Sequence, residues 1–497
     1  MELTQAVAAV KALQRRLKTW DYASGLLSHD GATVAPSSSA VPRGDALAQL
    51  AEARLREFTA HETGKLLEFL QTHADELDEQ TRREVEMLVE QYDRQTRIPP
   101  AEWAAFQRLL ALSESVWEEA KHQNDYAKWE PYLARVLDAQ RKMAGYTQPN
   151  KHPYDAMLDD YEKGQTRETL DRFFSMLVPR LSPLVRMVAD SPKQIDDRFL
   201  RRHYPIDRQR QLTAILTKTM GLSPTVCAVG ESEHPFTADL CRQDTRITTH
   251  YHENDLASSL YSVIHEAGHA RYALGIDASL DGSVLADGAS MGIHESQSRF
   301  FENIVGRSKP FIHFLFPALQ KLFPEQLADV NEHGFWLAVN KVTPSLIRTE
   351  ADPVTYSLHV AIRYELEKQL IDGTLSTREL PEAWNALYKQ TLGVTVPDDT
   401  HGVLQDSHWA GGAFGYFPTY ALGSAYGAQM LASMPVDWSA VAAGDLSAIT
   451  DWLSARVWQH GALYPPSDLL NRVCGAPFSP QYYIDYLTQI CIDVYDL

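Results

Sequence analysis

The sequence predicts a mainly α-helical fold, and three observations support this prediction. Apolar residues recur at three- and four-residue spacing through most of the first half of the chain, as on the buried face of an amphipathic helix. A single stretch alternates polar and β-branched residues in the way a strand does. No linker divides the chain, so residues 1–497 are expected to form one domain around one large core or two adjoining ones.

The expected elements follow one another along the chain. Helices are expected over residues 1–20, 44–72, 77–96, 101–122, 127–145 and 167–190. The segment 28–42 is rich in Ser, Gly and Pro and has no period, which predicts a surface loop or a lid.

The one expected strand covers residues 244–251 and belongs to a small β-sheet. Its period of two places Asp244, Arg246 and Thr248 on one face. Two interpretations of this strand remain open. Its edge could bind an extended peptide, or this face could be the polar outer side of the sheet.

Composition excludes several classes of partner. The formal net charge of −19 argues against nucleic acid or an anionic membrane, because both attract clustered Lys and Arg. No apolar run approaches the ~20 residues of a membrane span, and the N-terminus lacks the pattern of a signal peptide. The cysteines have no metal-binding or disulfide-scaffold spacing, which favours a reduced cytoplasm: Cys227, Cys241, Cys474 and Cys491.

The motif HExxH, at residues 265–269, lies within a predicted helix of residues 255–274. Asn254 is the expected N-cap and Gly275 the expected C-cap of this helix. His265 and His269 then lie one turn apart on the same face, where their ring nitrogens can converge on one metal ion. The small sheet precedes this helix directly in the sequence.

A catalytic site needs a third protein ligand in addition to the two histidines. Glu295 is the candidate, because it belongs to a polar cluster on an otherwise core-facing helix of residues 290–305. His294 is the next candidate, and Glu302 could compete from the other end of this helix. Position 299, where some zinc peptidases carry a supporting acidic residue, is Arg299, so support for the ligands must come from elsewhere.

Six motifs in a fixed order resemble those of the carboxypeptidase Taq family of metallocarboxypeptidases. In this chain they occupy residues 234–236 (HPF), 244–248 (DTRIT), 265–269 (HEAGH), 294–296 (HES), 347–352 (IRTEAD) and 402–409 (GVLQDSHW). The specific resemblance covers about residues 230–425. It implies a helical peptidase fold with a deep substrate groove, Zn²⁺ or Co²⁺ as cofactor, release of single residues from peptide C-termini, and frequently a homodimer. It also supports Glu295 as the third ligand.

The proposed chemistry assigns roles to Glu266, His408 and Tyr420. A divalent ion on two imidazoles and a carboxylate lowers the pKa of its bound water towards ~7, and Glu266 is the expected general base. The glycine-rich stretch 401–427 is expected to form a mobile loop over the substrate. Within it His408 and Tyr420, whose spacing resembles a pair in helical zinc oligopeptidases, are the candidates to stabilise the oxyanion, with Tyr416 as a rival.

A carboxypeptidase also needs a cation that binds the terminal carboxylate, and Arg348 is the main candidate. A guanidinium can bind a carboxylate through two parallel hydrogen bonds. The alternative for Arg348, within its helical pattern, is an ion pair with Asp352 at i+4. Arg246 is the second candidate for this clamp, and His234 could border the substrate groove.

Three functions are therefore compared on the sequence alone. The first is a cytoplasmic metallocarboxypeptidase acting on peptides with a free C-terminus. The second is a helical zinc oligopeptidase that cuts internal bonds and needs no clamp at Arg348. The third is a non-catalytic binding protein with a structural metal, which the presence of Glu266 disfavours because a structural site needs no base.

Overall fold

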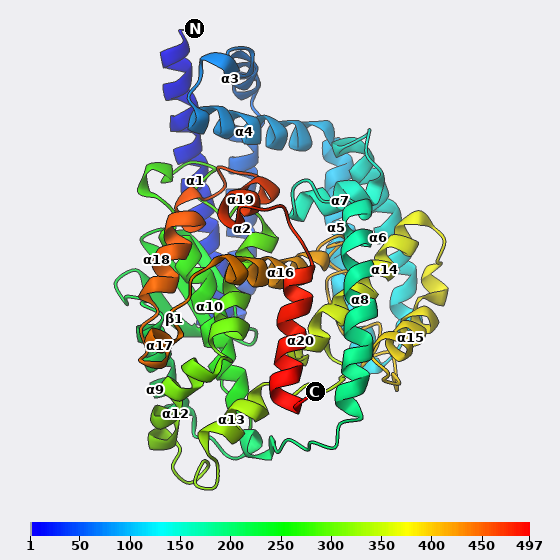
Figure 1. The fold of residues 1–497 in the computed structure, drawn as a ribbon. Coiled ribbons are helices and arrows are strands. Elements are labelled where there is room, and N and C mark those ends of the chain that lie inside the picture. The colour runs from blue at the N-terminus through cyan, green and yellow to red at the C-terminus, as the bar shows by residue number, and fades with distance from the viewer. Residues whose placement is uncertain (1) are drawn as a thin grey trace.

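The fold is mainly helical, as the sequence predicts. The computed structural model describes residues 2–497 and contains a single small sheet within them. In Figure 1 the first helices occupy one end of the molecule, and two groups of helices extend from there. One group surrounds the sheet and α10, the other contains α5–α8 with α14 and α15, and α16 lies between them.

The six helices predicted for this part of the chain are present, with three differences. The predicted helix 1–20 continues to residue 33, the predicted helix 44–72 is two helices because the chain breaks at residues 59–60, and the helix Pro153–Tyr161 was not predicted. Met1 lies outside the described residues. The bounds are α1 Leu3–Thr33, α2 Ala40–Phe58, α3 His61–Thr72, α4 Glu79–Arg97, α5 Pro100–Gln123, α6 Tyr126–Thr147, α7 Pro153–Tyr161 and α8 Arg167–Ala189.

The predicted loop at residues 28–42 is wrong for most of its length. Helix α1 continues to Thr33, and only a short turn separates it from α2. Gly31 lets the two helices approach, because a Cβ there would lie 2.6 Å from the Arg43 Nε. Pro42 falls in the first turn of α2, where its missing N–H is not needed. The glycine and proline therefore serve helix packing and a helix start.

The sheet has three strands in the order β1-β3-β2. Strands β1 (Cys227–Glu231) and β2 (Thr237–Cys241) flank β3 (Asp244–Thr249), the first parallel and the second antiparallel to it. Because β3 is central, both of its edges are paired, and the interpretation that it offers an edge to a peptide is wrong. The sequence did not predict β1 and β2, which are only five residues long.

The middle of the chain supplies the helices of the HExxH region. Asp255, not Asn254, caps α10, because its carboxylate accepts a hydrogen bond from the Ser258 amide at 3.1 Å. Gly275 ends α10 against Trp458, whose ring would lie 2.7 Å from an added Cβ. The bounds are α9 Ile206–Thr219, α10 Leu256–Gly275, α11 Met291–Arg299, a π-helix Phe300–Val305, α12 Lys309–Leu322 and α13 Glu332–Val339.

The last helices correct two further expectations. Arg348 lies in a 3₁₀ turn, Arg348–Glu350, ahead of α14 and not within a helix. The predicted loop 401–427 ends at residue 417, because Pro418 starts α16 and thereby places Tyr420 on a helix. The bounds are α14 Pro353–Asp372, α15 Leu380–Thr391, α16 Pro418–Ser433, α17 Trp438–Ala442, α18 Ser447–Arg456, α19 Pro466–Cys474 and α20 Gln481–Tyr495.

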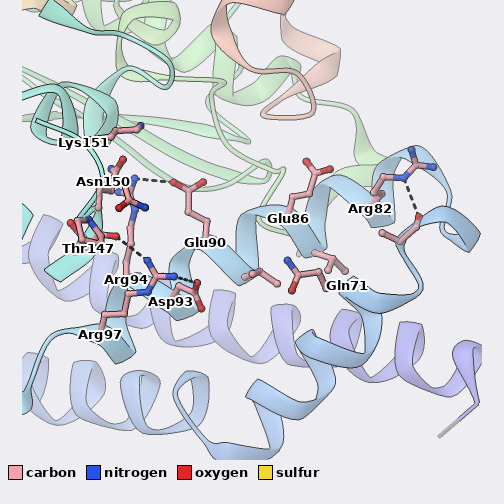
Figure 2. A pocket seen from close by; sticks show the side chains of 15 residues that line it. Gln71, Arg82, Glu86, Glu90, Asp93, Arg94, Arg97, Thr147, Asn150 and Lys151 are labelled. Carbon is pink, nitrogen blue, oxygen red and sulfur yellow. Dashed lines mark hydrogen bonds and ion pairs between the residues drawn. The ribbon is translucent and has the colours of Figure 1, made fainter. Parts of the chain in front are cut away.

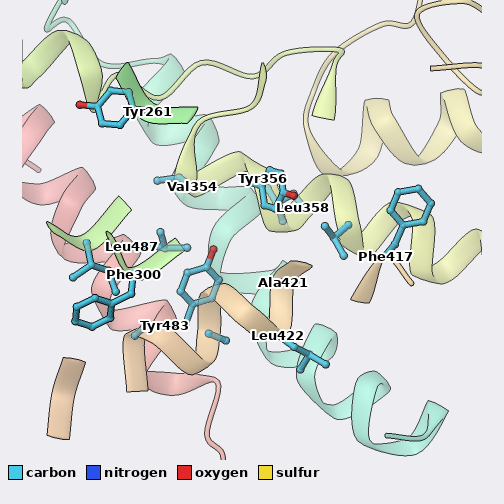
Figure 3. Packing of buried hydrophobic residues seen from close by; sticks show 14 of the residues in the cluster. Tyr261, Phe300, Val354, Tyr356, Leu358, Phe417, Ala421, Leu422, Tyr483 and Leu487 are labelled. Atoms are coloured by element: carbon cyan, nitrogen blue, oxygen red, sulfur yellow. The ribbon is translucent and has the colours of Figure 1, made fainter. Parts of the chain in front are cut away.

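One large buried cluster joins the helices that carry the candidate site. Figure 3 shows part of it, with Phe300, Val354, Phe417 and Tyr483 contributed by four different segments. A second, smaller cluster lies among α1, α3 and α4 and includes Leu88. Among the helices of residues 2–497, none combines the length and apolar character required to cross a membrane.

Candidate metal centre and active site

Two helices bring together the three predicted metal ligands. His265 and His269 on α10 and Glu295 on α11 offer ligand atoms that all lie within 4.8 Å of one another. The Glu295 Oε2 is 3.7 Å from the His265 Nε2 and 3.5 Å from the His269 Nε2. Two imidazoles and one carboxylate are the donor set of a catalytic zinc site, so these residues fit a divalent ion.

Glycines set the close approach of the helices around this cluster. At Gly268, within the HExxH motif, an added Cβ would lie 2.7 Å from the Gln297 carbonyl oxygen on α11. At Gly423 on α16, an added Cβ would lie 2.7 Å from the Glu295 Cβ. Any side chain at these two positions would push α11 away from its neighbours and displace Glu295.

Glu302 supports the first histidine and does not compete for the metal position. Its Oε2 lies 2.8 Å from the His265 Nδ1, on the side of the ring opposite Nε2. This contact fixes which ring nitrogen faces the metal position. Glu302 lies in the π-helix that follows α11, and such wide turns are frequent at functional sites.

His294 and Arg299 each contact one of the predicted ligand residues. The His294 Nδ1 lies 2.6 Å from the His269 Nδ1, so His294 is beside the second ligand and outside the three-residue cluster. Arg299 occupies the position where some zinc peptidases carry a supporting acidic residue. It donates from Nε to the Glu295 Oε1 at 2.7 Å. A guanidinium therefore holds the ligand carboxylate and leaves its other oxygen facing the histidines.

Glu266 is buried beside the ligands, with 6% of its surface exposed. Its Oε2 accepts a hydrogen bond of 2.6 Å from the Thr237 hydroxyl on β2. Desolvation raises the pKa of Glu266, against the attraction of the neighbouring His265. Sequence analysis missed Thr237, although it directly follows the HPF motif.

Arg348 lies in a buried ionic network and has 5% of its surface exposed. Its Nε and Nη2 donate to the Asp406 Oδ1 at 3.2 and 2.9 Å, and its Nη1 donates to the Tyr356 hydroxyl at 3.2 Å. Arg363 donates from Nε to the second oxygen of Asp406 at 2.7 Å. The predicted alternative, an ion pair of Arg348 with Asp352, is wrong because the Asp352 carboxylate caps α14.

His408 and Tyr420 lie together beside Arg348. The His408 Nε2 is 3.1 Å from the Tyr420 hydroxyl, and the Arg348 guanidinium carbon is 4.8 Å from the Tyr420 ring centroid. Burial and the positive charge of Arg348 lower the pKa of His408 to about 4, so its imidazole is neutral at pH 7. The Tyr416 ring packs 5.2 Å from that of Tyr420, centroid to centroid.

The chain matches a single family model along nearly all of its length. That model, carboxypeptidase Taq (M32) metallopeptidase, covers residues 9–491. Carboxypeptidase 1 of Bacillus subtilis is 37% identical over 487 residues, which are 97% of each chain. The protein belongs to the carboxypeptidase Taq family. It is therefore a metallocarboxypeptidase, a hydrolase of peptides that depends on a divalent metal ion.

Other relatives agree with this assignment. Thermostable carboxypeptidase 1 of Thermus thermophilus is 38% identical over 409 residues, 80% of each chain. The crystal structure of an M32 carboxypeptidase from Deinococcus radiodurans superposes with a TM-score of 0.96 at 34% identity, over 99% of this chain and 100% of that one. A carboxypeptidase structure from Pyrococcus furiosus gives a TM-score of 0.94 at 30% identity, over 98% and 99%.

The loop that carries His408 in this carboxypeptidase is anchored by a buried carboxyl group. Glu367 on α14 accepts hydrogen bonds from the Trp409 Nε1 at 2.7 Å, the Gly415 amide at 2.9 Å and the Tyr154 hydroxyl at 2.7 Å. Burial raises the pKa of Glu367 to about 7, against these three donors. Hydrogen bonds therefore attach this stretch to the core, in contrast to the mobile loop that the sequence predicts. Nothing in the sequence around Glu367 indicated this role.

Arg246 and His234 of the carboxypeptidase lie on the sheet side of the molecule. Arg246 donates from Nε and Nη2 to the two oxygens of Asp244, each at 2.8 Å, so one edge of its guanidinium is occupied. The Tyr22 hydroxyl on α1 donates to the same carboxylate at 2.9 Å. His234 is exposed ahead of β2, and its carbonyl oxygen accepts from Ser232. Neither residue belongs to the Arg348 network.

Two surface clefts lie away from this centre. Figure 2 shows the larger one, of about 470 Å³, between α4 and the turn that follows α6, with Arg94, Arg97 and Lys151 along it. The second cleft, of about 320 Å³, is lined by Arg307 and Trp336 among others. Neither of these two clefts is lined by a predicted metal ligand or catalytic residue, so the groove expected from the resemblance stays a prediction.

Proposed function

We propose that this carboxypeptidase releases one residue at a time from peptide C-termini, with Arg348 binding the terminal carboxylate. Asp406 occupies the Nε–Nη2 edge of the guanidinium, and Tyr356 takes one N–H of Nη1. These contacts use three of its five N–H groups, which leaves donors on Nη1 and Nη2 for another carboxylate. This remaining edge is the observation that carries the proposal.

Tyr356 links the clamp to the metal centre. Its ring lies 4.0 Å from the guanidinium carbon of Arg299, which holds Glu295, and its hydroxyl accepts from Arg348 at 3.2 Å. One buried aromatic ring therefore separates the group that holds a metal ligand from the proposed clamp. This fixed spacing supports cleavage at the last peptide bond. A peptide whose terminal carboxylate is bound at Arg348 can place only the bonds close to its C-terminus at the metal position.

The proposed reaction divides between the metal ion and the side chains around it. His265, His269 and Glu295 would hold a divalent ion, which would supply Lewis-acid activation of water and of the scissile carbonyl. Glu266 accepts the proton of the attacking water and later donates it to the leaving amine. Tyr420 donates its hydroxyl proton to the oxyanion as it forms, and neutral His408 donates from Nε2 to the Tyr420 oxygen and so holds this hydroxyl in place. Tyr416, packed on Tyr420, is the alternative donor.

Five finer assignments are part of the same proposal. Zn²⁺ is the proposed ion, with Co²⁺ as an alternative, because two imidazoles and one carboxylate suit both. The four cysteines are unpaired, which supports a cytoplasmic location. Residues 1–497 are proposed to act as one catalytic domain, and a homodimer is proposed from the family resemblance. Arg246 and His234 are proposed to border the substrate groove, from the sheet side.

The test is mass spectrometry of a mixed peptide pool incubated with the metal-loaded protein. We expect ladders that shorten from the C-terminus by one residue at a time, and only slow hydrolysis of C-terminally amidated peptides. Internal fragments, or equal hydrolysis of amidated and free peptides, would contradict the exopeptidase assignment and favour an oligopeptidase.

A further inference from the structure

Apart from the proposed place of His234 and Arg246 at the border of the substrate groove, the HPF and DxRxT motifs have no role in the reaction described above, yet they meet next to its general base. Both lie in the small sheet, HPF just before β2 and DxRxT along β3. Thr237 opens β2 directly after HPF and pairs with Ile247 of β3. Its hydroxyl lies 2.6 Å from the Glu266 Oε2 and 3.2 Å from the Glu266 carbonyl oxygen.

The two contacts are not equivalent, because a threonine hydroxyl has a single proton to donate. The shorter distance and the charge of the carboxylate both favour Oε2 as the acceptor. Among the described residues, Glu266 accepts no other side-chain hydrogen bond. Its Oε1 is therefore the oxygen left for the substrate side. The bond from Thr237 persists whether Oε1 carries a proton or not, since Oε2 remains an acceptor in both states.

The DxRxT motif fixes the position of this hydroxyl. The Thr248 hydroxyl of β3 accepts from the Phe236 amide at 2.9 Å and lies 2.6 Å from the Ser232 hydroxyl. The Thr248 amide in turn donates to the Phe236 carbonyl oxygen at 2.9 Å. These three bonds hold the residue that precedes Thr237 in place, so the start of β2 has little freedom to move.

The sheet also contacts the HExxH helix at a second point on the same face. The Thr249 hydroxyl of β3 lies 2.8 Å from the Ser262 hydroxyl on α10. Ser262 and Glu266 are four residues apart and share one face of α10, whereas His265 and His269 share another. One face of this helix is thus directed to the sheet and the other to the metal position.

We propose that Thr237 is the positioning residue of the general base. Its hydroxyl holds Oε2 of Glu266 and so directs Oε1 towards the attacking water and the leaving amine. The HPF and DxRxT motifs together form the rigid support for this hydroxyl. The inference rests on the proposed role of Glu266 in the reaction and adds to it a residue that does not touch the substrate.

The decisive variants are Thr237→Val and Thr237→Ser in the metal-loaded full-length protein. Valine keeps the shape and removes the hydroxyl, while serine keeps the hydroxyl and removes the methyl group. We expect kcat of the valine variant to fall about 10- to 100-fold with little change in KM, since a hydrogen bond to a charged group is lost. Serine is expected to restore most of kcat. If serine is as impaired as valine, the role of Thr237 is packing and the inference fails.

Thr249→Val is the matched control, because it removes a hydroxyl from the same sheet that contacts the same helix without touching Glu266. It is expected to lower the melting temperature and leave kcat nearly unchanged. An equal loss of kcat in both valine variants would overturn the inference.

Two further measurements distinguish a positioning role of Thr237 from a loss of bound metal. A third comparison, with Glu266→Gln, distinguishes failure of this inference from failure of the proposed function. Metal affinity of Thr237→Val, measured by chelator competition, should equal that of the wild type. A crystal structure of this variant should show the Glu266 carboxylate rotated or in two conformers, and an unchanged carboxylate would overturn the inference. If Glu266→Gln is fully active, the proposed function itself fails, whereas an inactive Glu266→Gln with an unimpaired Thr237→Val removes only the inference.

Discussion

The metal centre and the carboxylate clamp are built in opposite ways. His265, His269 and Glu295 come from two successive α-helices, and their spacing follows from the helical repeat and one close helix pair. The clamp takes Arg348 from a 3₁₀ turn and Asp406 from an irregular segment. The metal centre is thus encoded by local geometry. The clamp exists only when segments distant in the chain pack together.

The two regions also differ in how their charges are balanced. Around the metal position the three carboxyl groups of Glu266, Glu295 and Glu302 lie with two histidines, Arg299 and the more distant Arg307, whose Nη2 is 3.7 Å from the Glu302 Oε1. This excess of acceptors suits a cation. In the clamp two arginines share the single carboxylate of Asp406, which leaves one positive charge for an anionic ligand. Four predictions test this contrast, in order of decreasing effect.

Glu266→Gln should have the largest effect. Loss of the general base is expected to lower kcat by about 10⁴-fold, the upper end for proton transfer by a positioned side chain. The metal content should not change, because Glu266 is not a ligand. Peptide assays with parallel metal analysis measure both quantities. A variant that keeps its metal and its full rate would show that the proposed mechanism is incorrect.

Arg348→Ala should lower kcat/KM for peptides with a free C-terminus by about a thousandfold, as expected for the loss of one partner of a buried, hydrogen-bonded charge pair. The slow hydrolysis of amidated peptides should be unaffected. Arg348→Lys keeps the charge without the planar fork, and it serves as the control for the loss of positive charge next to Asp406, which Arg363 still contacts. Equal losses on free and amidated peptides would mean that Arg348 only supports the fold.

Tyr420→Phe should lower kcat by about a hundredfold, the usual loss for one oxyanion donor. Tyr416→Phe should lower it much less, because the His408 Nε2 bonds to Tyr420. Steady-state kinetics of the two variants, side by side, decide between the tyrosines. If Tyr416→Phe is the more damaging change, the roles of the two residues are reversed.

Glu302→Gln should have the smallest effect, seen in metal affinity and not primarily in rate. Loss of the negative charge behind His265 is expected to weaken metal binding about tenfold. Competition with a chelator measures this directly. Glu332→Gln, on the exposed pair of Glu332 with His313, is the control and should leave affinity unchanged. An unaltered affinity of Glu302→Gln would show that this carboxylate does not support the ligand.

Predictions from periodicity were confirmed where the residue pattern of a single segment was enough to define a helix. The helix around HExxH was placed within one residue of α10, because the spacing of its apolar positions is a local signal, although its N-cap is Asp255 and not the predicted Asn254. Boundaries that depend on contacts were wrong. Gly31 and Pro42 suggested a loop, yet they permit a close helix pair and a helix start. The central position of β3 could not be predicted, since it depends on strands too short to give a pattern of their own.

The sequence by itself determined the helical class, and it indicated His265 and His269 as metal ligands, Glu266 as the base and Glu295 as the best candidate for the third ligand. These follow from spacing along helices, where neighbours in space are three or four residues apart in the chain. Only the tertiary structure decided that Glu302 and Arg299 support the ligands, that Asp406 occupies one edge of Arg348, and that Thr237 contacts Glu266. Most of these contacts join residues of different elements. The residue pattern of one segment cannot indicate which side chain of a distant segment will contact it.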